Sequence, residues 1–261
     1  MTVTVSVLGS GSRGNTTFIK TSTTRILIDA GLSRRELGKR LLSIGEDPNA
    51  IDVVLITHEH NDHAAGLKTL VKELKVQAFL TTGTMREIRA DEFELNGSTL
   101  TAISEGVTFR VGDADITPFG VPHDAAEPVA FSIYSDGVRV TQLTDIGHLP
   151  EDVTEHLRDS NVLILESNHD LEMLRVGPYP WSLKQRLMGR FGHLSNTGVA
   201  QFIREQFDGT ASHLLLAHLS ERNNHPAVAR QESMKALRDR GYKTAVTLTS
   251  QQYPTAPIQI S

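Results

Sequence analysis

The sequence predicts an α/β (α+β) fold in a single domain of residues 1–261, with two strand-rich layers and helices on the outside. Three observations lead to this prediction. Apolar strand-like runs alternate with helical patterns up to residue 81 and again after residue 145. The intervening residues 107–145 are rich in strand patterns. No linker, internal repeat or low-complexity segment divides the chain.

The first third of the chain alternates between strands and helices. Strands are expected over residues 3–9, 23–31, 52–60 and 76–81. A helix is expected over residues 33–45, because Ser33 and Glu36 fit a capping box and Gly45 fits a helix stop. A second helix is expected at about residues 63–74.

The rest of the chain begins with strands and then alternates again. Strand patterns occur in VTFRV, ADITPFGV, VAFSIYSD and VRVTQLTD, and SDG at residues 135–137 is a hairpin signal. Further strands are expected over residues 162–167, 213–220 and 243–249. Helices are expected over residues 150–158, 180–189, 196–207 and 226–239.

The composition favours a cytoplasmic globular protein. Hydrophobic residues make up 39% of the chain, but no apolar run approaches the roughly 18 residues of a membrane span. The N-terminus lacks the basic and apolar regions of a signal peptide. Cysteine is absent, so any metal must be bound by His, Asp or Glu. The net charge of −5 gives no global attraction for nucleic acid, so a polyanion site would be local.

The strongest motif is HEHNDH at residues 58–63, which follows the apolar run DVVLIT. On an extended segment, His58, His60 and Asp62 lie on one side, and a turn beginning at Asp62 brings His63 beside them. Three imidazoles and a carboxylate suit Zn²⁺, Mn²⁺ or Fe²⁺. The alternative is a solvated polar loop in which the histidines occur by chance.

This motif favours two metal ions, because four ligands within six residues fit one tetrahedral ion only with strain. Two ions about 3.5–4 Å apart would share the ligands better, and they need further ligands with a bridging carboxylate. Three candidates each follow an apolar strand, namely His123, Asp145 and His218. Taken alone, His123 or Asp145 fits an ordinary loop residue equally well, and their order after HEHNDH favours them as ligands.

These segments resemble the metallo-β-lactamase superfamily over nearly the whole chain. The resemblance includes LIDAG around Asp29, the HxHxDH signature, and then a His, an Asp and a His at strand ends. Within the superfamily, GSGSRGN, THEHNDHAAGL, PHDAAEPVAF, LTDIGH, LESNHD, GHLSN and HLSERNN are similar to the YycJ/WalJ group of bacterial nuclease-like proteins. The resemblance implies a four-layer αββα sandwich with a site for two divalent ions, Zn²⁺ or Mn²⁺.

The resemblance also implies which residues bind the metals. The implied ligands are His58, His60 and His123 for one ion, Asp62, His63 and His218 for the other, and Asp145 as the bridge. The β-CASP nucleases of the superfamily insert an extra domain in the region between Asp145 and His218. Only 73 residues separate these two positions here, which leaves no room for that domain.

Two residues outside the ligand set point to the reaction. Glu166 ends the strand in LILESNHD, and His193 in GHLSN precedes an expected helix. The tRNA-processing nucleases of the superfamily are similar at both places. By this resemblance Glu166 orients His193, His193 protonates the leaving oxygen, and both act with the ligand Asp62. The alternative is that His193 is a surface residue at a helix start, with Ser195 as the N-cap.

A basic and aromatic stretch indicates a nucleic-acid substrate. Residues 173–204 contain five Lys or Arg residues and no Asp or Glu, and they include the only tryptophan. The candidate substrate contacts are Arg175, Trp181, Lys184, Arg186 and Arg190, with His169, and with Arg13 and Asn15 of the Gly-rich loop. The alternative is a solvated helix with Trp181 packed in the core.

These features favour a metal-dependent phosphodiesterase. The resemblance implies a 5′-to-3′ exonuclease acting on DNA with a free 5′ end, with a role in DNA repair. The competing hypotheses are a small-molecule metallo-hydrolase of lactones, thioesters or other acyl substrates, an RNA-processing nuclease, and a non-catalytic binding protein. The Gly/Pro-rich arm with which tRNA-processing relatives bind tRNA is not evident. This absence makes tRNA maturation a less favoured function for this chain.

Overall fold

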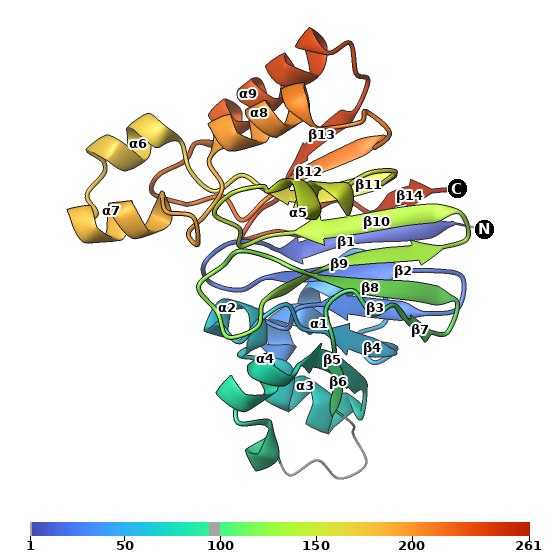
Figure 1. Cartoon of the computed structure of the whole chain (residues 1–261). Helices are drawn as coiled ribbons and strands as arrows, with labels where there is room; N and C mark the ends of the chain where they lie inside the picture. Colours follow the sequence, from blue (N-terminus) through green and yellow to red (C-terminus); the bar gives the residue numbers. More distant parts are fainter. Residues whose placement is uncertain (1, 94–99) are drawn as a thin grey trace. The chain divides into compact units, whose positions relative to one another are not determined.

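The computed structural model describes residues 2–93 and 100–261 (Figure 1). The chain divides into two compact units. Unit 1 comprises residues 1–120, 125–138 and 250–261, and unit 2 comprises residues 121–124 and 139–249. The expected single domain stays a prediction.

Unit 1 contains a mixed sheet with the strand order β14-β1-β2-β3-β4-β5-β6. The strands are β1 (Val3–Gly9), β2 (Thr16–Lys20), β3 (Arg25–Ile28), β4 (Val53–Leu55), β5 (Gln77–Thr81), β6 (Leu100–Ile103) and β14 (Ile258–Ile260). Strands β3 to β6 pair in parallel, whereas β14, β1, β2 and β3 pair antiparallel. The parallel strands therefore end at one edge of the sheet.

The helices of unit 1 cover this sheet with apolar side chains. They are α1 (Arg34–Ser43), α2 (Asn61–Ala64), α3 (Leu67–Leu74), α4 (Thr82–Glu87) and the 3-10 helix η1 (Ala90–Phe93). Leu41 of α1 and Leu70 of α3 pack in one core with Leu27 and Val54 of the strands. The Ser33 half of the predicted capping box is confirmed, since the Ser33 side chain accepts a hydrogen bond from the Glu36 backbone N–H, whereas the Glu36 side chain accepts from Lys39.

The expected helix over residues 63–74 is two helices in the structure. The chain turns at Gly66, whose N–H donates to the Ala30 carbonyl at 2.7 Å. This bond joins the break between α2 and α3 to the segment that follows β3. The break also lets α2 begin at Asn61, so that Asp62 and His63 lie in a short helix.

Unit 1 also contains an antiparallel meander of β7 (Phe109–Val111), β8 (Ala114–Gly120) and β9 (Val129–Ser135). The predicted turn at residues 135–137 is present. Asp136 and Gly137 both have positive φ, at 52° and 82°, as type I′ turns require.

Unit 2 is built on the parallel strands β10 (Val138–Leu143), β11 (Val162–Glu166), β12 (His213–Ala217) and β13 (Ala245–Leu248). Its helices are α5 (Glu151–Glu155), α6 (Leu171–Val176), α7 (Trp181–Leu187), α8 (Asn196–Glu205) and α9 (Pro226–Asp239). Helices α8 and α9 lie side by side (Figure 1). The predicted helix over residues 226–239 is confirmed with the same bounds.

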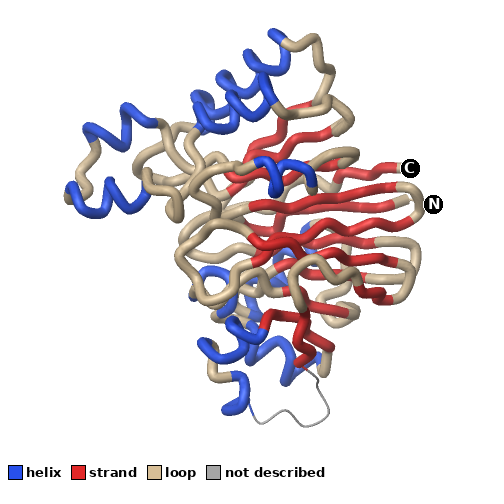
Figure 2. The backbone as a smooth tube through the Cα atoms, viewed as in Figure 1, coloured by secondary structure: helices blue, strands red, loops and turns tan. Residues whose placement is uncertain are grey.

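The parallel arrangement brings the carboxyl ends of β10, β11 and β12 to one edge of unit 2, where each strand passes into a loop (Figure 2). Asp145, Glu166 and His218 stand at these three strand ends. Residues far apart in the sequence thereby come together. Within residues 2–93 and 100–261, no helix is both long and apolar enough to cross a membrane.

Candidate metal centre

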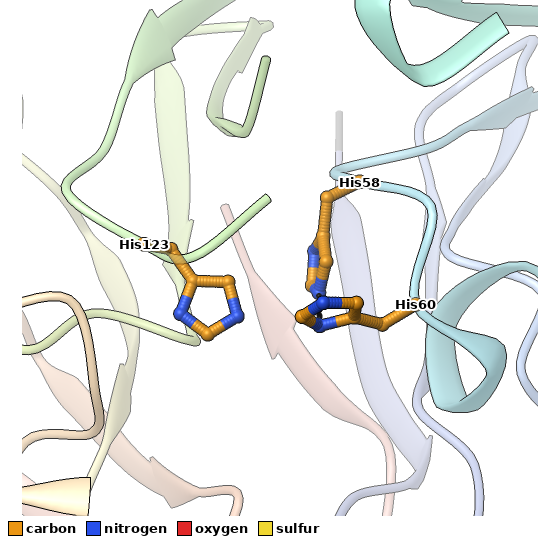
Figure 3. Close-up of side chains that lie close together, drawn as sticks. All are labelled: His58, His60 and His123. Atoms are coloured by element: carbon orange, nitrogen blue, oxygen red, sulfur yellow. Dashed lines mark hydrogen bonds between the residues drawn. The ribbon is translucent and has the colours of Figure 1, made fainter. Parts of the chain in front are cut away.

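In unit 1, the loop after β4 brings the imidazoles of His58 and His60 together (Figure 3). His58 Nε2 lies 3.1 Å from His60 Nδ1. Two nitrogens that bind the same tetrahedral Zn²⁺ ion, each at 2.0–2.1 Å, are about 3.4 Å apart. The spacing of these two nitrogens therefore fits two ligands of one ion.

A second pair of ligand atoms lies beside the first. His63 Nε2 is 3.5 Å from Asp62 Oδ2, again close to the spacing of two ligands on one ion. His63 is fully buried, and its ring lies 4.1 Å from the ring of His58, centre to centre. Unit 1 thus places three imidazoles and one carboxylate within one short segment.

A buried carboxylate, Asp29, fixes the orientation of these histidines. Asp29 Oδ2 lies 2.8 Å from His63 Nδ1, and Asp29 accepts hydrogen bonds from the N–H and hydroxyl of Thr57. The Thr57 hydroxyl in turn lies 3.0 Å from His58 Nδ1. With Nδ1–H of both histidines directed at oxygen atoms, the Nε2 lone pairs are left for a metal ion.

Asn15, a predicted substrate contact, is buried beneath the same loop. Its side-chain N–H₂ lies 3.2 Å from Asp62 Oδ2 and 3.0 Å from His63 Nε2. Its side-chain oxygen accepts from the Gly11 N–H at 2.8 Å. The Gly-rich loop after β1 therefore supports the HEHNDH motif, and the role of Asn15 with substrate stays a prediction.

Three residues at strand ends have left-handed backbone conformations. These are Asp29, Asp145 and His218, with φ of 65°, 58° and 54°. Side chains other than glycine adopt this conformation at an energetic cost, and such residues cluster at functional sites. Here the conformation turns each side chain at the point where its strand stops.

In unit 2, a single carboxylate oxygen contacts two imidazoles. Glu166 Oε1 lies 2.8 Å from Nδ1 of His193 and 2.8 Å from Nδ1 of His218. Glu166 Oε2 accepts from the backbone N–H groups of Ile146 and Leu194. Ligand atoms of Asp145, Glu166, His193 and His218 all lie within 4.8 Å of one another.

These contacts shift the pKa values of Glu166 and His193. Burial favours a raised pKa for Glu166, but the charge of His193 and hydrogen bonds from His193 and His218 lower that pKa well below its usual range. Burial favours a lowered pKa for His193, but the carboxylates of Glu166 and Asp145 raise it. An ionised Glu166 beside a protonated His193 is the favoured state.

His123 lies in the segment after β8 and belongs to unit 2. It is buried, and its ring lies 5.6 Å from that of His193, centre to centre. Burial lowers the pKa of His123 and favours the neutral imidazole that binds metals, although Asp145 acts in the opposite direction. Unit 2 therefore gathers all its predicted ligands on one side of β10–β12.

The other predicted substrate contacts of unit 2 are mostly paired with each other or with acidic side chains. Arg175 pairs with Glu172 at 2.8 Å, and Arg186 pairs with Asp124. Lys184 is buried and donates to the Arg175 carbonyl. Arg190 contacts His148 and pairs with no acidic side chain among the described residues. Trp181 is 61% exposed, so it is not a core residue.

Unit 1 contains a separate concentration of positive charge. Arg13, a predicted contact, lines a cavity of about 860 Å³ together with Arg34, Arg35 and Arg40. Among the described lining residues Glu36 is the one carboxylate; it pairs with Arg40, and Arg34 pairs with Glu73 outside the lining. Ala65 and Gly66, which follow the HEHNDH motif, line the same cavity. A basic surface therefore adjoins the metal-ligand loop in a chain of net charge −5.

Sequence reasoning missed two supporting contacts. Asp29 was noted only as a strand end, and Thr57 was not noted, although together they hold His58 and His63. The signal was the position of Asp29 at the end of a strand adjacent to the HEHNDH strand. The contact of Glu166 with His218, in addition to His193, was also not expected.

Comparison with known proteins identifies the family of the chain. A model of the beta-lactamase superfamily domain matches residues 24–219, and the chain belongs to this superfamily. Within it, the chain is a YycJ/WalJ-like member. Exodeoxyribonuclease YycJ of Bacillus anthracis is 34% identical over 239 residues, covering 91% of this chain and 90% of the relative. Exodeoxyribonuclease WalJ of Streptococcus pneumoniae is 33% identical over 234 residues, covering 89% and 87%.

A solved structure with the same fold supports the fold class. The metallo-β-lactamase fold protein YhfI from Bacillus subtilis matches with a TM-score of 0.75 and 17% identity, covering 98% of this chain and 99% of that chain. The predicted family and the predicted αββα metallo-β-lactamase fold class are confirmed. The His and Asp groups, in this fold, are of the type that binds divalent metal ions.

Proposed function

We propose that this chain is a 5′-to-3′ exodeoxyribonuclease that uses two divalent metal ions, Zn²⁺ or Mn²⁺. The broader class, a metal-dependent nuclease or phosphodiesterase, is confirmed by its relatives. The observation that carries the finer proposal is the similarity, over about nine-tenths of the chain, to proteins named exodeoxyribonucleases. The predicted acyl hydrolase has no comparable support.

The proposed metal centre uses the ligands that the resemblance implies. The proposed ligands are His58, His60 and His123 for one ion, Asp62, His63 and His218 for the other, and Asp145 as the bridge. The spacing of ligand atoms within unit 1 and within unit 2 supports this assignment. The bound ions would lower the pKa of the attacking water and polarise the phosphoryl oxygen.

The reaction also needs a proton donor for the leaving oxygen, and we assign this role to His193. Glu166 accepts the Nδ1–H of His193 at 2.8 Å, which directs Nε2 away from the carboxylate. The buried negative charge of Glu166 stabilises the imidazolium that donates the proton. Hydrolysis then forms a bond from the water oxygen to phosphorus and breaks the bond from phosphorus to the leaving oxygen.

The arginine-lined cavity supports a polyanionic substrate. Arg13 and Arg35 of this cavity carry positive charge beside the HEHNDH loop, whereas Arg34 pairs with Glu73. Guanidinium groups bind phosphates through several hydrogen bonds at once. The phosphodiester backbone of DNA fits this cavity better than an uncharged ester does. A cytoplasmic location and a role in DNA repair stay predictions.

Labelled oligonucleotides test the proposal. Protein loaded with Zn²⁺ or Mn²⁺ should release labelled nucleotides from 5′-labelled DNA at once, and from 3′-labelled DNA only after the strand has been shortened. RNA of the same sequence should be degraded more slowly. Endonucleolytic fragments, or inactivity of the loaded protein on all nucleic acids with Asp62→Ala as the control, would contradict the proposal.

His193→Ala separates proton donation from metal binding. It should lower kcat on DNA by about 10²–10⁴-fold, the usual contribution of a general acid. Metal content, measured by atomic emission after dialysis, should match the wild type. A loss of bound metal in His193→Ala would instead make His193 a ligand.

A further inference from the structure

A cavity of about 310 Å³ in unit 2 opens beside His193. Residues 193–195, which precede α8, line this cavity together with Gln201 and Phe202 of α8. The volume lies at the lower end of the range found for small-molecule sites. The cavity therefore has room for a compact group such as a single ring system.

His169, which lines this cavity, has two buried polar atoms without partners. The residue is 2% exposed, and within the described part of the chain neither ring nitrogen makes a hydrogen bond. Burying a polar group without a partner costs free energy, so such groups are rare and require an explanation. Burial is the main cause that lowers the pKa of His169 to about 4, so the ring is neutral at pH 7. A neutral imidazole offers one donor and one acceptor.

Among the described lining residues, two positions of the cavity carry charge, Glu205 and the protonated His193. Within the described residues it contains no Lys or Arg, and Glu205 is its one carboxylate. The apolar lining residues are Leu149, Leu171, Met188, Leu194 and Phe202. A phosphate would meet no Lys or Arg there, and the protonated His193 is already paired with Glu166. The walls also contain the polar side chains of His148, Gln201 and Gln206. A flat, neutral ring with hydrogen-bonding groups along its edge, as in a nucleobase, would match His169 and this mixture of apolar and polar side chains.

The walls of the cavity are held in place by backbone contacts. The Asn196 N–H donates to the His169 carbonyl at 2.9 Å, and the Asn168 N–H donates to the Leu194 carbonyl at 2.7 Å. The buried side chains of Ser167 and Asn196 are joined by a further hydrogen bond of 2.7 Å. A ligand would therefore enter a preformed site and would lose little affinity to ordering of the protein.

We propose that this cavity binds the nucleobase of the nucleotide that leaves, with His169 hydrogen-bonded to the edge of the base. The proposal rests on the proposed function, because His193 lines the cavity and is the group assigned to the leaving oxygen. In a 5′-to-3′ exonuclease, the leaving nucleotide is the 5′-terminal one. The terminal base is thus taken out of the stack, while the phosphates bind elsewhere.

Abasic substrates test this assignment. Single-stranded DNA with an abasic residue at the first 5′ position should show a kcat/KM for release of that residue about tenfold below that of normal DNA, within the range for loss of one bound base. The same residue at the second position should leave release of the first nucleotide unchanged. Equal kcat/KM values for the normal and first-position abasic strands would overturn the proposal.

Variants identify the role of His169. His169→Phe keeps a ring but removes both nitrogens, so kcat/KM on normal DNA should fall about tenfold while activity on the first-position abasic strand stays near wild type. The matched control is His213→Phe, at the far end of β12 from the site. It should keep the wild-type preference for normal DNA. A His169→Phe enzyme with the full wild-type preference would refute the role of His169.

Binding of products gives a readout without turnover. By calorimetry, a deoxynucleoside 5′-monophosphate should bind the wild type about tenfold more tightly than deoxyribose 5-phosphate, and His169→Phe should remove this difference. Equal affinities in the wild type would overturn the base pocket. If only the proposed nuclease function were wrong, the protein would be inactive on both normal and abasic DNA. It would still bind the deoxynucleoside 5′-monophosphate more tightly than deoxyribose 5-phosphate.

Discussion

At the residue scale, the site depends on which nitrogen of each histidine faces an oxygen. Asp29 and Thr57 face the Nδ1 atoms of His63 and His58, and Glu166 faces those of His193 and His218. Two buried carboxylates thus fix the tautomers of the imidazoles around them. The identity of the ligands alone does not decide which nitrogen of each ring is left for a metal ion.

Asp29→Asn should weaken metal binding without unfolding the protein. Asparagine keeps the size of the side chain, but its neutral oxygen is a weaker acceptor for His63 Nδ1–H. Loss of such a supporting contact lowers metal affinity by about 10–100-fold. Titration against a chromophoric chelator measures this change. The control is Asp52→Asn, because Asp52 lies at the end of β4 opposite to the HEHNDH motif. Equal metal affinity in both variants would contradict the role of Asp29.

At the element scale, the loop after β3 packs closely against α2, the short helix that contains Asp62 and His63. A Cβ atom built on Gly31 would lie 1.7 Å from the Asp62 carbonyl oxygen and 2.7 Å from the Asn15 backbone nitrogen. Both neighbours are backbone atoms, which move only with their segments. Glycine at residue 31 is therefore required for three segments to meet: the loop after β1, the loop after β3, and α2.

Gly31→Ala should displace α2 and its ligands. We expect lower metal affinity and a loss of stability of about 1–3 kcal/mol, as for other overpacked sites. Chemical unfolding and metal titration measure the two effects. Gly45→Ala, where an added Cβ meets nothing within 4 Å, should leave metal affinity unchanged. Wild-type metal affinity in Gly31→Ala would show that the loops adjust independently.

Another element-scale contact, between two turns of unit 1, should make stability depend on pH. Asp113 accepts hydrogen bonds from Thr21, Thr24 and the Thr23 backbone. Burial favours a raised pKa for Asp113, but these hydrogen bonds outweigh it and lower the pKa from 3.8 to about 2. The ionised group is favoured in the folded state, so its contribution is complete above about pH 4 and is lost as pH falls towards 2.

Asp113→Asn tests this dependence. After allowance for solvent screening, we expect the ionised carboxylate to add about 1 kcal/mol to stability near neutral pH. Urea unfolding at pH 6 and pH 3 should show the wild type losing part of its advantage over Asp113→Asn at the lower pH. A constant difference between the two proteins would contradict the lowered pKa.

At the scale of the whole molecule, bound metal should contribute to stability as well as to activity. Seven predicted ligands are distributed over the chain from residue 58 to residue 218. Ions that bind the folded chain and not the unfolded one stabilise it, by about 2.7 kcal/mol at a hundred times the dissociation constant. Bound metal is thus expected to raise the free energy of unfolding.

Removal of metal by a chelator should therefore lower Tm by several degrees and abolish DNA degradation. Addition of Zn²⁺ or Mn²⁺ after removal of the chelator should restore both, and the extent of recovery ranks the two ions. A His58→Ala/His63→Ala double variant should respond to the chelator less. Full activity and an unchanged Tm in chelator would contradict a metal-dependent enzyme.

The sequence alone identified the family and predicted the metal ligands, because HEHNDH and the polar residues after apolar strands are local patterns. It also indicated most strands and helices, although β2, β6 and β14 were not expected, since short strands carry little periodicity. Only the tertiary structure placed Asp29 against His63 and joined Glu166 to both His193 and His218. It also brought Glu172 and Asp124 to Arg175 and Arg186, so a stretch that is basic in sequence is largely neutralised in space. These contacts link distant residues, and hydrogen bonds and ion pairs of that kind leave no periodic trace along the chain.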